Sequence, residues 1–263
     1  MKLSLNISLL IVCINLLYAC QMSLWNNTPE DDNALVVTVE RYDRLQSRFL
    51  TNGDFSALQT MNTNYPIETR ALIENILQIG NVDQADINEN FLKYYQDSTL
   101  QQIIREVDIQ YSNMDDINEN LTTAFTRLQQ MIPHIHIPLI YTQIGALDQS
   151  IVVGDSIVGI CLDKYLGSDF KIYKKYYTEH QLQTMTREHI VPDCLLFYIV
   201  SLYPLEDFDN STQEVRDEHI GRIMHTVNTA IGKRFFKMEH VKKAEKYMTT
   251  HPKTSWQSFL SYQ

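Results

Sequence analysis

The chain has 263 residues, of which 44% are hydrophobic, 10% aromatic and 21% charged, a composition that excludes a disordered chain, a collagen and a coiled-coil rod. The formal net charge is -10, from 22 basic and 32 acidic residues, which disfavours a nucleic-acid binder because such proteins normally carry a basic excess. Four cysteines in a chain of this length are too few for a disulfide scaffold.

Residues 1–19 have the pattern of a lipoprotein signal peptide. Lys2 supplies a positive charge, and the nearly unbroken apolar run that follows is short for a membrane span, which needs about 20 apolar residues. The run ends in Leu-Tyr-Ala-Cys, a lipobox in which Tyr18 is bulkier than the usual residue. We therefore expect cleavage before Cys20 and acylation of its thiol and new amine. The alternative is an ordinary secretory signal followed by a chance cysteine.

Acylation of Cys20 predicts a firm membrane anchor, because each buried CH₂ group contributes about 0.8 kcal/mol. Gln21 follows the cysteine, so the aspartate that would retain a lipoprotein in the inner membrane is not at that position. We expect an outer-membrane lipoprotein that faces the periplasm. Residues 20–33 are polar and aperiodic, as in a lipidated tether. Residues 34–263 contain no Ser/Gly-rich linker and are expected to form a single α+β domain.

The first half of that domain is predicted to be helical after one short strand. The β-branched run Ala34–Val39 predicts the strand, and residues 41–131 have helical periodicity. Ser98 and Gln101 have the spacing of a capping box for a helix over 99–110. The amphipathic segment Asp116–Met131 predicts a further helix that ends before Pro133.

The second half contains the predicted sheet. Three apolar runs predict strands, and the Gly154-Asp155 pair predicts a hairpin in which Gly154 supplies a positive φ. The third run has no polar alternation, which indicates an interior strand. Ser211 and Glu214 have capping-box spacing for a long helix over 213–238, and two more helices are expected near 239–249 and 254–261. The predicted fold is α+β, mostly helical, with a small and largely antiparallel sheet. The strands are predicted at Ile135–Ile144, Ile151–Val153 and Ile157–Leu162.

Two pairs of histidines are candidate metal ligands. The chain has no His-Glu-x-x-His, and His219 and His225 lie about 120° apart on the predicted long helix, so they cannot share one ion. We expect His219 at the border of the buried face and His225 on the solvent side. His134 and His136 would share a face if residues 134–140 were extended, which makes them a weak metal-binding pair without an identifiable third ligand.

Other polar residues have favoured structural interpretations. Asp163 follows the predicted buried strand, where functional carboxylates often lie, but a turn or cap role is favoured. Asp193 is interpreted as a helix cap. Cys161 and Cys194 lie in apolar runs, which favours buried thiols over a disulfide between them. The 15 Tyr, 10 Phe and 2 Trp favour core packing over a carbohydrate- or lipid-binding surface.

Besides the lipobox Cys20, short motifs spread over about residues 34–237 contain Arg41, Asp43, Asp163, Tyr165, Gly167, Pro192, Asp193, Gly232 and Lys233. In their order and spacing these motifs resemble the gliding-motility lipoprotein GldB family of Bacteroidota. The resemblance implies an outer-envelope lipoprotein linked to the gliding machinery or its relatives. It also implies a distant kinship with predicted zinc-dependent peptidases of zincin-like fold, with the metal motif absent.

These features favour a non-catalytic, lipid-anchored scaffold or partner-binding protein of the envelope. Its expected partners are the membrane, through the lipid, and envelope proteins, without nucleic acid and without a cofactor. The alternative is a divergent zinc-dependent metallohydrolase or peptidase that uses His134, His136 and a distant carboxylate. No nucleophile elbow, phosphate-binding glycine loop, EF-hand or Cys-x-x-Cys motif occurs in the sequence.

Overall fold

The computed structural model describes residues 35–261. Cys20, the predicted signal peptide and the predicted tether lie outside these residues. Val37–Gln263 belong to one compact unit. The longer helices are α2 (Tyr42–Asn52), α3 (Phe55–Asn64), α5 (Ile87–Tyr94), α6 (Ser98–Gln110), α7 (Asp115–Met131), α9 (Ile190–Leu202), α10 (Gln213–Ile231) and α11 (Glu239–Thr250). The shorter ones are α4 (Pro66–Arg70), η1 (Ala71–Ile76), η2 (Leu162–Lys164), η3 (Tyr173–Lys175), α8 (Glu179–Leu182), η4 (Arg187–His189) and α12 (Trp256–Leu260).

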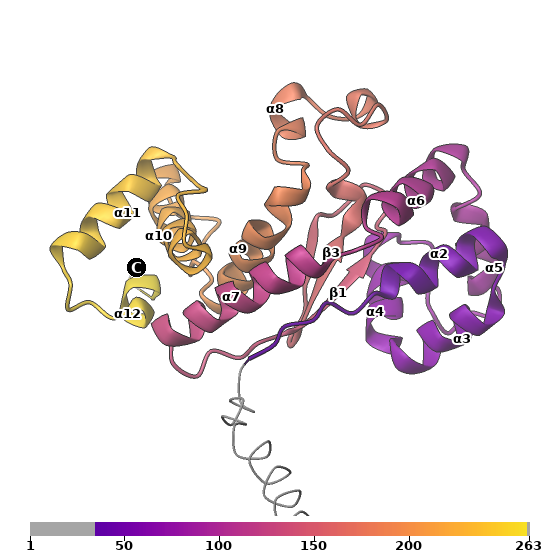
Figure 1. Cartoon of the computed structure of the whole chain (residues 1–263), viewed down its shortest axis with the longest axis horizontal. Helices are drawn as coiled ribbons and strands as arrows, with labels where there is room; N and C mark the ends of the chain where they lie inside the picture. The colour runs from indigo at the N-terminus through magenta and orange to yellow at the C-terminus, as the bar shows by residue number, and fades with distance from the viewer. Residues whose placement is uncertain (1–34, 262–263) are drawn as a thin grey trace, which may run out of the picture. The chain divides into compact units, whose positions relative to one another are not determined.

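A three-stranded mixed sheet lies at the centre of this helical fold (Figure 1). Its strands are β1 (Leu139–Gln143), β2 (Ile151–Val153) and β3 (Ile157–Cys161), in the order β1-β3-β2. The α+β prediction is confirmed, as are the hairpin and the interior position of β3. The pairing of β1 with β3 is parallel, so the expectation of a largely antiparallel sheet is corrected. Gly154 is not among the residues with positive φ, so it does not serve the turn in the predicted way.

Gly159 makes room in the sheet for a buried tyrosine. It pairs with Tyr141 across β1 and β3, and a Cβ atom at Gly159 would lie 2.6 Å from the Tyr141 ring. Tyr141 is fully buried, and its ring packs edge-on against Tyr42 of α2. The glycine therefore lets an aromatic side chain pack closely against the central strand.

The described part of the predicted strand Ala34–Val39 is extended but is not a strand. A single parallel bridge, Glu40 with Tyr141, joins this segment to β1. The amides of Val37 and Val39 donate instead to side chains of α7, Thr122 Oγ1 and Asn118 Oδ1, at 3.0 Å each. Because α7 accepts these bonds, the segment does not form a ladder with the sheet.

Two helix caps differ by one residue from the sequence prediction. Asp97, rather than Ser98, caps α6, and its Oδ1 accepts from the amides of Thr99 and Leu100 at 2.8 and 3.1 Å. Thr212, rather than Ser211, caps α10 by accepting from the Val215 amide. The helix α10 ends at Ile231, before the predicted end at residue 238, because Gly232 adopts the left-handed conformation with φ of 73°.

Helices cover the sheet and extend beyond it (Figure 1). The helix α2 packs on β1, and α9 packs on β2 and β3. The helix α7 contacts both α9 and α10, and α11 and α12 pack against α10. The helix α9 therefore lies between the sheet and the helices α7 and α10.

Tyrosines form much of the core. Their burial confirms the core-packing interpretation for these rings. Several of their hydroxyls donate hydrogen bonds to backbone carbonyl oxygens of loops. Tyr95 donates to Ile144 O at 2.5 Å, and Tyr111 donates to Tyr165 O at 2.6 Å. These bonds hold the chain where it leaves β1 and β3. The fully buried tyrosines are Tyr42, Tyr95, Tyr111, Tyr141, Tyr165 and Tyr173.

Candidate functional site

Asp163 lies just beyond β3 in the short helix η2, and its side chain is fully buried. Its two carboxylate oxygens accept from the amides of Gly145 and Leu147, at 2.7 and 2.5 Å. Ala146 and Leu147 both have positive φ, 53° and 69°, which is strained for residues with a Cβ atom. The carboxylate therefore holds the strained loop after β1. Burial raises the pKa of Asp163 to about 6, although the two amides act in the opposite direction.

Tyr165 connects the segment that follows β3 to the helix α9. Its hydroxyl donates to Asp193 Oδ2 at 3.0 Å. Asp193 lies in the first turn of α9, whose N-cap residue is His189, so the predicted capping role of Asp193 is wrong. Burial raises the pKa of Asp193 to about 7, opposed by the hydrogen bond from Tyr165.

Asp193 and Tyr165 line a small cavity of about 200 Å³, the α8–α9 pocket. Lys164 also lines it, with its Nζ atom donating to the Tyr177 hydroxyl at 2.9 Å and lying 4.3 Å from the centre of that ring. Gly167 closes this segment at φ of 102°, where its amide donates to Met185 O. The remaining lining residues of the pocket are Ser150, Tyr177, Gln181, Thr184 and Met185.

A second hollow, the α7–α9 groove, lies on the other side of the start of α9 and has a volume of about 380 Å³. It brings Glu188 and Pro192 together with Lys233, although the two segments are about forty residues apart in the chain. Pro192 therefore lines the groove while its neighbour Asp193 lines the α8–α9 pocket. The other lining residues are Asp116, Ile117, Asn120, Thr123, Arg187, Val191 and Ile231.

Arg187 fixes one wall of this groove. Its guanidinium forms a bidentate ion pair with Asp116, at 2.6 and 3.0 Å, and donates to the carbonyls of Gln110 and Asn113. It also lies 4.9 Å from the centre of the Tyr111 ring. The arginine lowers the pKa of Asp116. Sequence reasoning missed this pair, because the only signal for Arg187 is its place a few residues before the family positions Pro192 and Asp193.

Arg41 and Asp43 lie at the other edge of the sheet, beside β1. They form a bidentate ion pair, at 2.8 Å for both bonds, in which Asp43 is fully buried. Asp43 also accepts from the Thr142 hydroxyl in β1. This pair attaches the start of α2 to the sheet and lines neither the groove nor the α8–α9 pocket.

The structure separates the histidine candidates. His134 has φ of 68° and β1 begins only at Leu139, so the extended conformation that would give His134 and His136 a shared face is not present; both are exposed. Within residues 35–261, no group of three or more His, Cys, Asp or Glu side chains could hold a metal ion. His219 is buried, and His225 packs against Trp256 and Phe259 at 5.5 and 6.0 Å between ring centres. The solvent-side position predicted for His225 is therefore wrong, because α12 covers it.

The two cysteines of the described residues, Cys161 and Cys194, are buried free thiols, which confirms the favoured interpretation. Burial raises the pKa of Cys161 well above its ordinary value and that of Cys194 to about 12. Both thiols are therefore protonated at neutral pH, and thiolate chemistry is suppressed.

None of the helices between residues 35 and 261 combines the length and the apolar character that a membrane span requires. No curated protein and no solved structure matches this chain. The model of the family described as "Gliding motility protein GldB" matches residues 25–221, about three quarters of the chain. The match contains the groove residues from Asp116 to Pro192 and the whole α8–α9 pocket, but it ends before Gly232 and Lys233. This chain therefore belongs to the GldB family of gliding motility proteins.

Proposed function

We propose that this protein is a lipid-anchored, non-catalytic component of the gliding-motility envelope machinery that binds a protein partner in the α7–α9 groove. The observation that supports this proposal is the convergence of two separate segments, Glu188–Pro192 and Ile231–Lys233, on one surface hollow. The carboxylates of Asp43 and Asp163, by contrast, are fully buried and already bonded within the fold. Glu188 and Lys233 of the groove have no ion pair within the described residues, whereas those two carboxylates are bonded within the fold.

The groove has the mixed chemistry of a peptide-binding surface. Ile117, Val191 and Pro192 supply apolar contacts, and Glu188 and Lys233 supply opposite charges near them. Neither charged side chain has an ion pair within the described residues. The wall behind them is rigid because Arg187 is held by Asp116 and by two backbone carbonyls. A preformed groove of this kind reduces the entropy lost when a partner segment binds.

The partner proposal can be tested with a photo-crosslinking residue placed at Asn120, which lines the groove. The matched control is Asn90, which holds the same place in the first of two Asp-Ile-Asn-Glu-Asn segments, residues 86–90 and 116–120. Asn90 follows Ile87 in α5 and lies outside the groove. We expect a discrete crosslinked protein from position 120 in native envelopes, and none from position 90. Equal crosslinking from both positions contradicts the proposal.

Charge reversal provides a second test of the same surface. Lys233→Glu changes a groove residue, and Lys237→Glu changes an exposed lysine that does not line the groove. We expect Lys233→Glu to abolish the position-120 crosslink and Lys237→Glu to preserve it, with both variants retaining the wild-type melting temperature. Loss of the crosslink in both variants would indicate a general charge effect instead of groove binding.

The lipid anchor at Cys20 and the periplasm-facing outer-membrane position belong to the same proposal. Support comes from the lipobox in the sequence and from the membership of the GldB family. Cys20→Ala should release the protein from the membrane fraction, and mass spectrometry of the wild-type N-terminal peptide should show an acylated cysteine. A membrane-bound Cys20→Ala protein, or an unmodified wild-type thiol, contradicts the anchor. The metallohydrolase alternative would be supported by chelator-sensitive peptide cleavage by the purified protein.

A further inference from the structure

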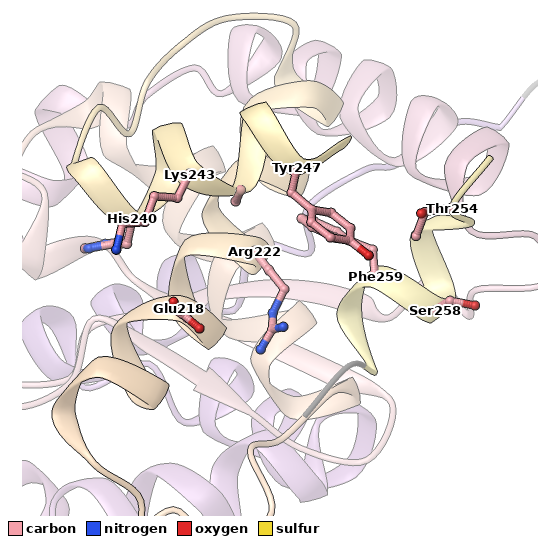
Figure 2. A pocket seen from close by; sticks show the side chains of 9 residues that line it. Glu218, Arg222, His240, Lys243, Tyr247, Thr254, Ser258 and Phe259 are labelled. Carbon is pink, nitrogen blue, oxygen red and sulfur yellow. The ribbon is translucent and has the colours of Figure 1, made fainter. Parts of the chain in front are cut away.

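A third hollow lies between α10, α11 and α12, and we call it the α10–α12 pocket (Figure 2). Its volume is about 410 Å³, large enough for a small organic molecule. Only Glu218 among its lining residues belongs to the part of the chain that the family model matches. The lining consists of Glu218, Arg222, His240, Lys243, Ala244, Tyr247, Thr254, Ser258 and Phe259.

The pocket is formed where α11 approaches α10 very closely. A Cβ atom at Gly221 would lie 2.7 Å from the carbonyl oxygen of His240, so glycine is needed for this approach. The approach carries His240 and Lys243 to the same wall of the pocket, above Arg222 of α10 (Figure 2). On the opposite side, the rings of Tyr247 and Phe259 are stacked, with 5.9 Å between their centres and 19° between their planes.

The wall near α11 is suited to an anion. Lys243 is exposed and has no ion pair within the described residues, whereas Lys242 of the same helix pairs with Glu239 and Glu245 pairs with Arg234. His240 Nε2 is buried and has no hydrogen-bond partner within residues 35–261, an arrangement that is unfavourable unless a ligand or water supplies the partner. A ligand oxygen at this place would satisfy the imidazole and neutralise the lysine.

The charges of the residues that line the pocket also favour an anionic ligand. Arg222 and Lys243 supply two positive charges, and Glu218 supplies the single negative charge among the lining residues. The aromatic side offers a different contact, because Tyr247 is 41% exposed and forms part of the pocket wall. Its ring is stacked on His251 and on Phe259, with 4.3 and 5.9 Å between ring centres, so a ligand meets the exposed edge of this stack. The two sides together match a molecule with an anionic group at one end and a flat apolar group at the other.

We propose that the α10–α12 pocket binds a small aromatic carboxylate. The carboxylate lies between Lys243 Nζ and His240 Nε2, and the ring of the ligand packs against Tyr247. The proposal is independent of partner binding in the α7–α9 groove, because the two hollows share no lining residue.

The test uses indole-3-acetate as the probe and indole-3-acetamide as its neutral counterpart, with the full-length chain in detergent. Selective isotope labelling of the eight histidines gives a resolvable signal for His240, assigned with His240→Gln. We expect indole-3-acetate to shift the His240 signal in a saturable manner and the amide to bind at least about fivefold more weakly, the loss typical of a partly exposed charge-assisted bond. An unshifted His240 signal, or equal binding of the acid and the amide, overturns the proposal.

Two lysine variants separate the site from a general charge effect. Lys243→Met should weaken the binding of indole-3-acetate about fivefold, while Lys246→Met, at an exposed position of α11 outside the pocket, should leave it unchanged. Tyr247→Ala should weaken binding of both probes because it removes the aromatic contact. Equal affinities for wild type and Lys243→Met, at an unchanged melting temperature, would contradict the proposal. If Lys243→Met lowers the melting temperature, Lys243→Gln is measured in its place and judged by the same comparison.

Discussion

The Tyr165 hydroxyl donates a 3.0 Å hydrogen bond to Asp193 Oδ2, and this bond joins the exit of β3 to the first turn of α9. The two residues also line the α8–α9 pocket, so the bond lies at its edge. Tyr165 is itself fixed, since its backbone carbonyl accepts from Tyr111 and its ring is buried. Burial raises the pKa of Asp193 beside this fixed hydroxyl donor, so its protonation state affects the stability of the fold.

The first prediction concerns the pH dependence of stability. Asp193 has a pKa of about 7 in the folded protein and about 3.9 in an unfolded chain. Between these two pH values the folded state binds more protons than the unfolded state, so the free energy of unfolding falls as the pH rises. Asp163, with a pKa of about 6, adds to this fall over a narrower range.

Asp193→Asn removes the titrating group while keeping an acceptor for Tyr165. We expect the variant to match wild type near pH 4 and to be more stable by about 2–4 kcal/mol at pH 8, because each tenfold change in acidity corresponds to about 1.4 kcal/mol. Urea denaturation at pH 4, 6 and 8 measures this difference. Asp155→Asn, an exposed position in the β2–β3 hairpin, is the control and should leave the pH slope unchanged. If the free energy of unfolding of Asp193→Asn depends on pH as steeply as that of wild type, the pKa of Asp193 is not raised and the prediction is wrong.

The second prediction concerns the loop that Asp163 holds. Asp163→Ala leaves the amides of Gly145 and Leu147 without their acceptor, and an unsatisfied buried amide costs about 1–3 kcal/mol. Removal of a buried charge offsets part of this loss, so we expect the free energy of unfolding to fall by about 2–4 kcal/mol. Asp163→Asn keeps one acceptor and should lose less. Denaturation curves test both variants beside Asp148→Asn, an exposed change in the same loop. Wild-type stability in Asp163→Ala, with loss of partner crosslinking, would instead assign Asp163 a functional role.

The third prediction concerns Gly221 within α10. Alanine is normally better than glycine in a helix by about 1 kcal/mol, so Gly221→Ala would be stabilising on propensity alone. Here the new Cβ would lie 2.7 Å from His240 O, which is backbone and cannot move without moving α11. We therefore expect a loss of about 1–3 kcal/mol in calorimetry or denaturation. Thr229→Ala, at an exposed position of the same helix, should be neutral or slightly stabilising. A gain of stability in Gly221→Ala would rule out the close helix approach.

The sequence was sufficient to predict those elements that depend on a local pattern of residues. The lack of polar alternation in residues 157–162 predicted the interior strand, and amphipathic periodicity predicted α7 to within one residue. Helix caps were displaced by one position because two competent capping residues stand side by side, Asp97 with Ser98 and Ser211 with Thr212. Either residue of each pair can accept from the first-turn amides, and tertiary packing decides which one does.

The sequence was insufficient where distant segments meet. The parallel pairing of β1 with β3 depends on where the chain crosses, and no residue within either strand specifies it. Arg187 and Asp116 are 71 positions apart, and Tyr165 and Asp193 are 28 apart, so their contacts follow only from the packing of α7 and α9. For this reason, the sequence alone did not reveal the groove, although Pro192 and Lys233, which line it, were both identified as family positions.

The fourth prediction concerns Gly232, which ends α10 beside the groove. Its φ of 73° favours glycine, and a Cβ atom there would lie 2.3 Å from Arg127 Nη1, which donates to Ala230 O. Gly232→Ala should therefore destabilise the protein by about 1–2 kcal/mol through backbone strain, together with a further contribution from the clash. A double-mutant cycle with Arg127→Ala separates the two, because only the clash disappears in that background. We expect the loss from Gly232→Ala to be smaller in the Arg127→Ala background but not zero. Strict additivity in denaturation experiments would show that the guanidinium simply moves aside and that the left-handed backbone alone requires glycine.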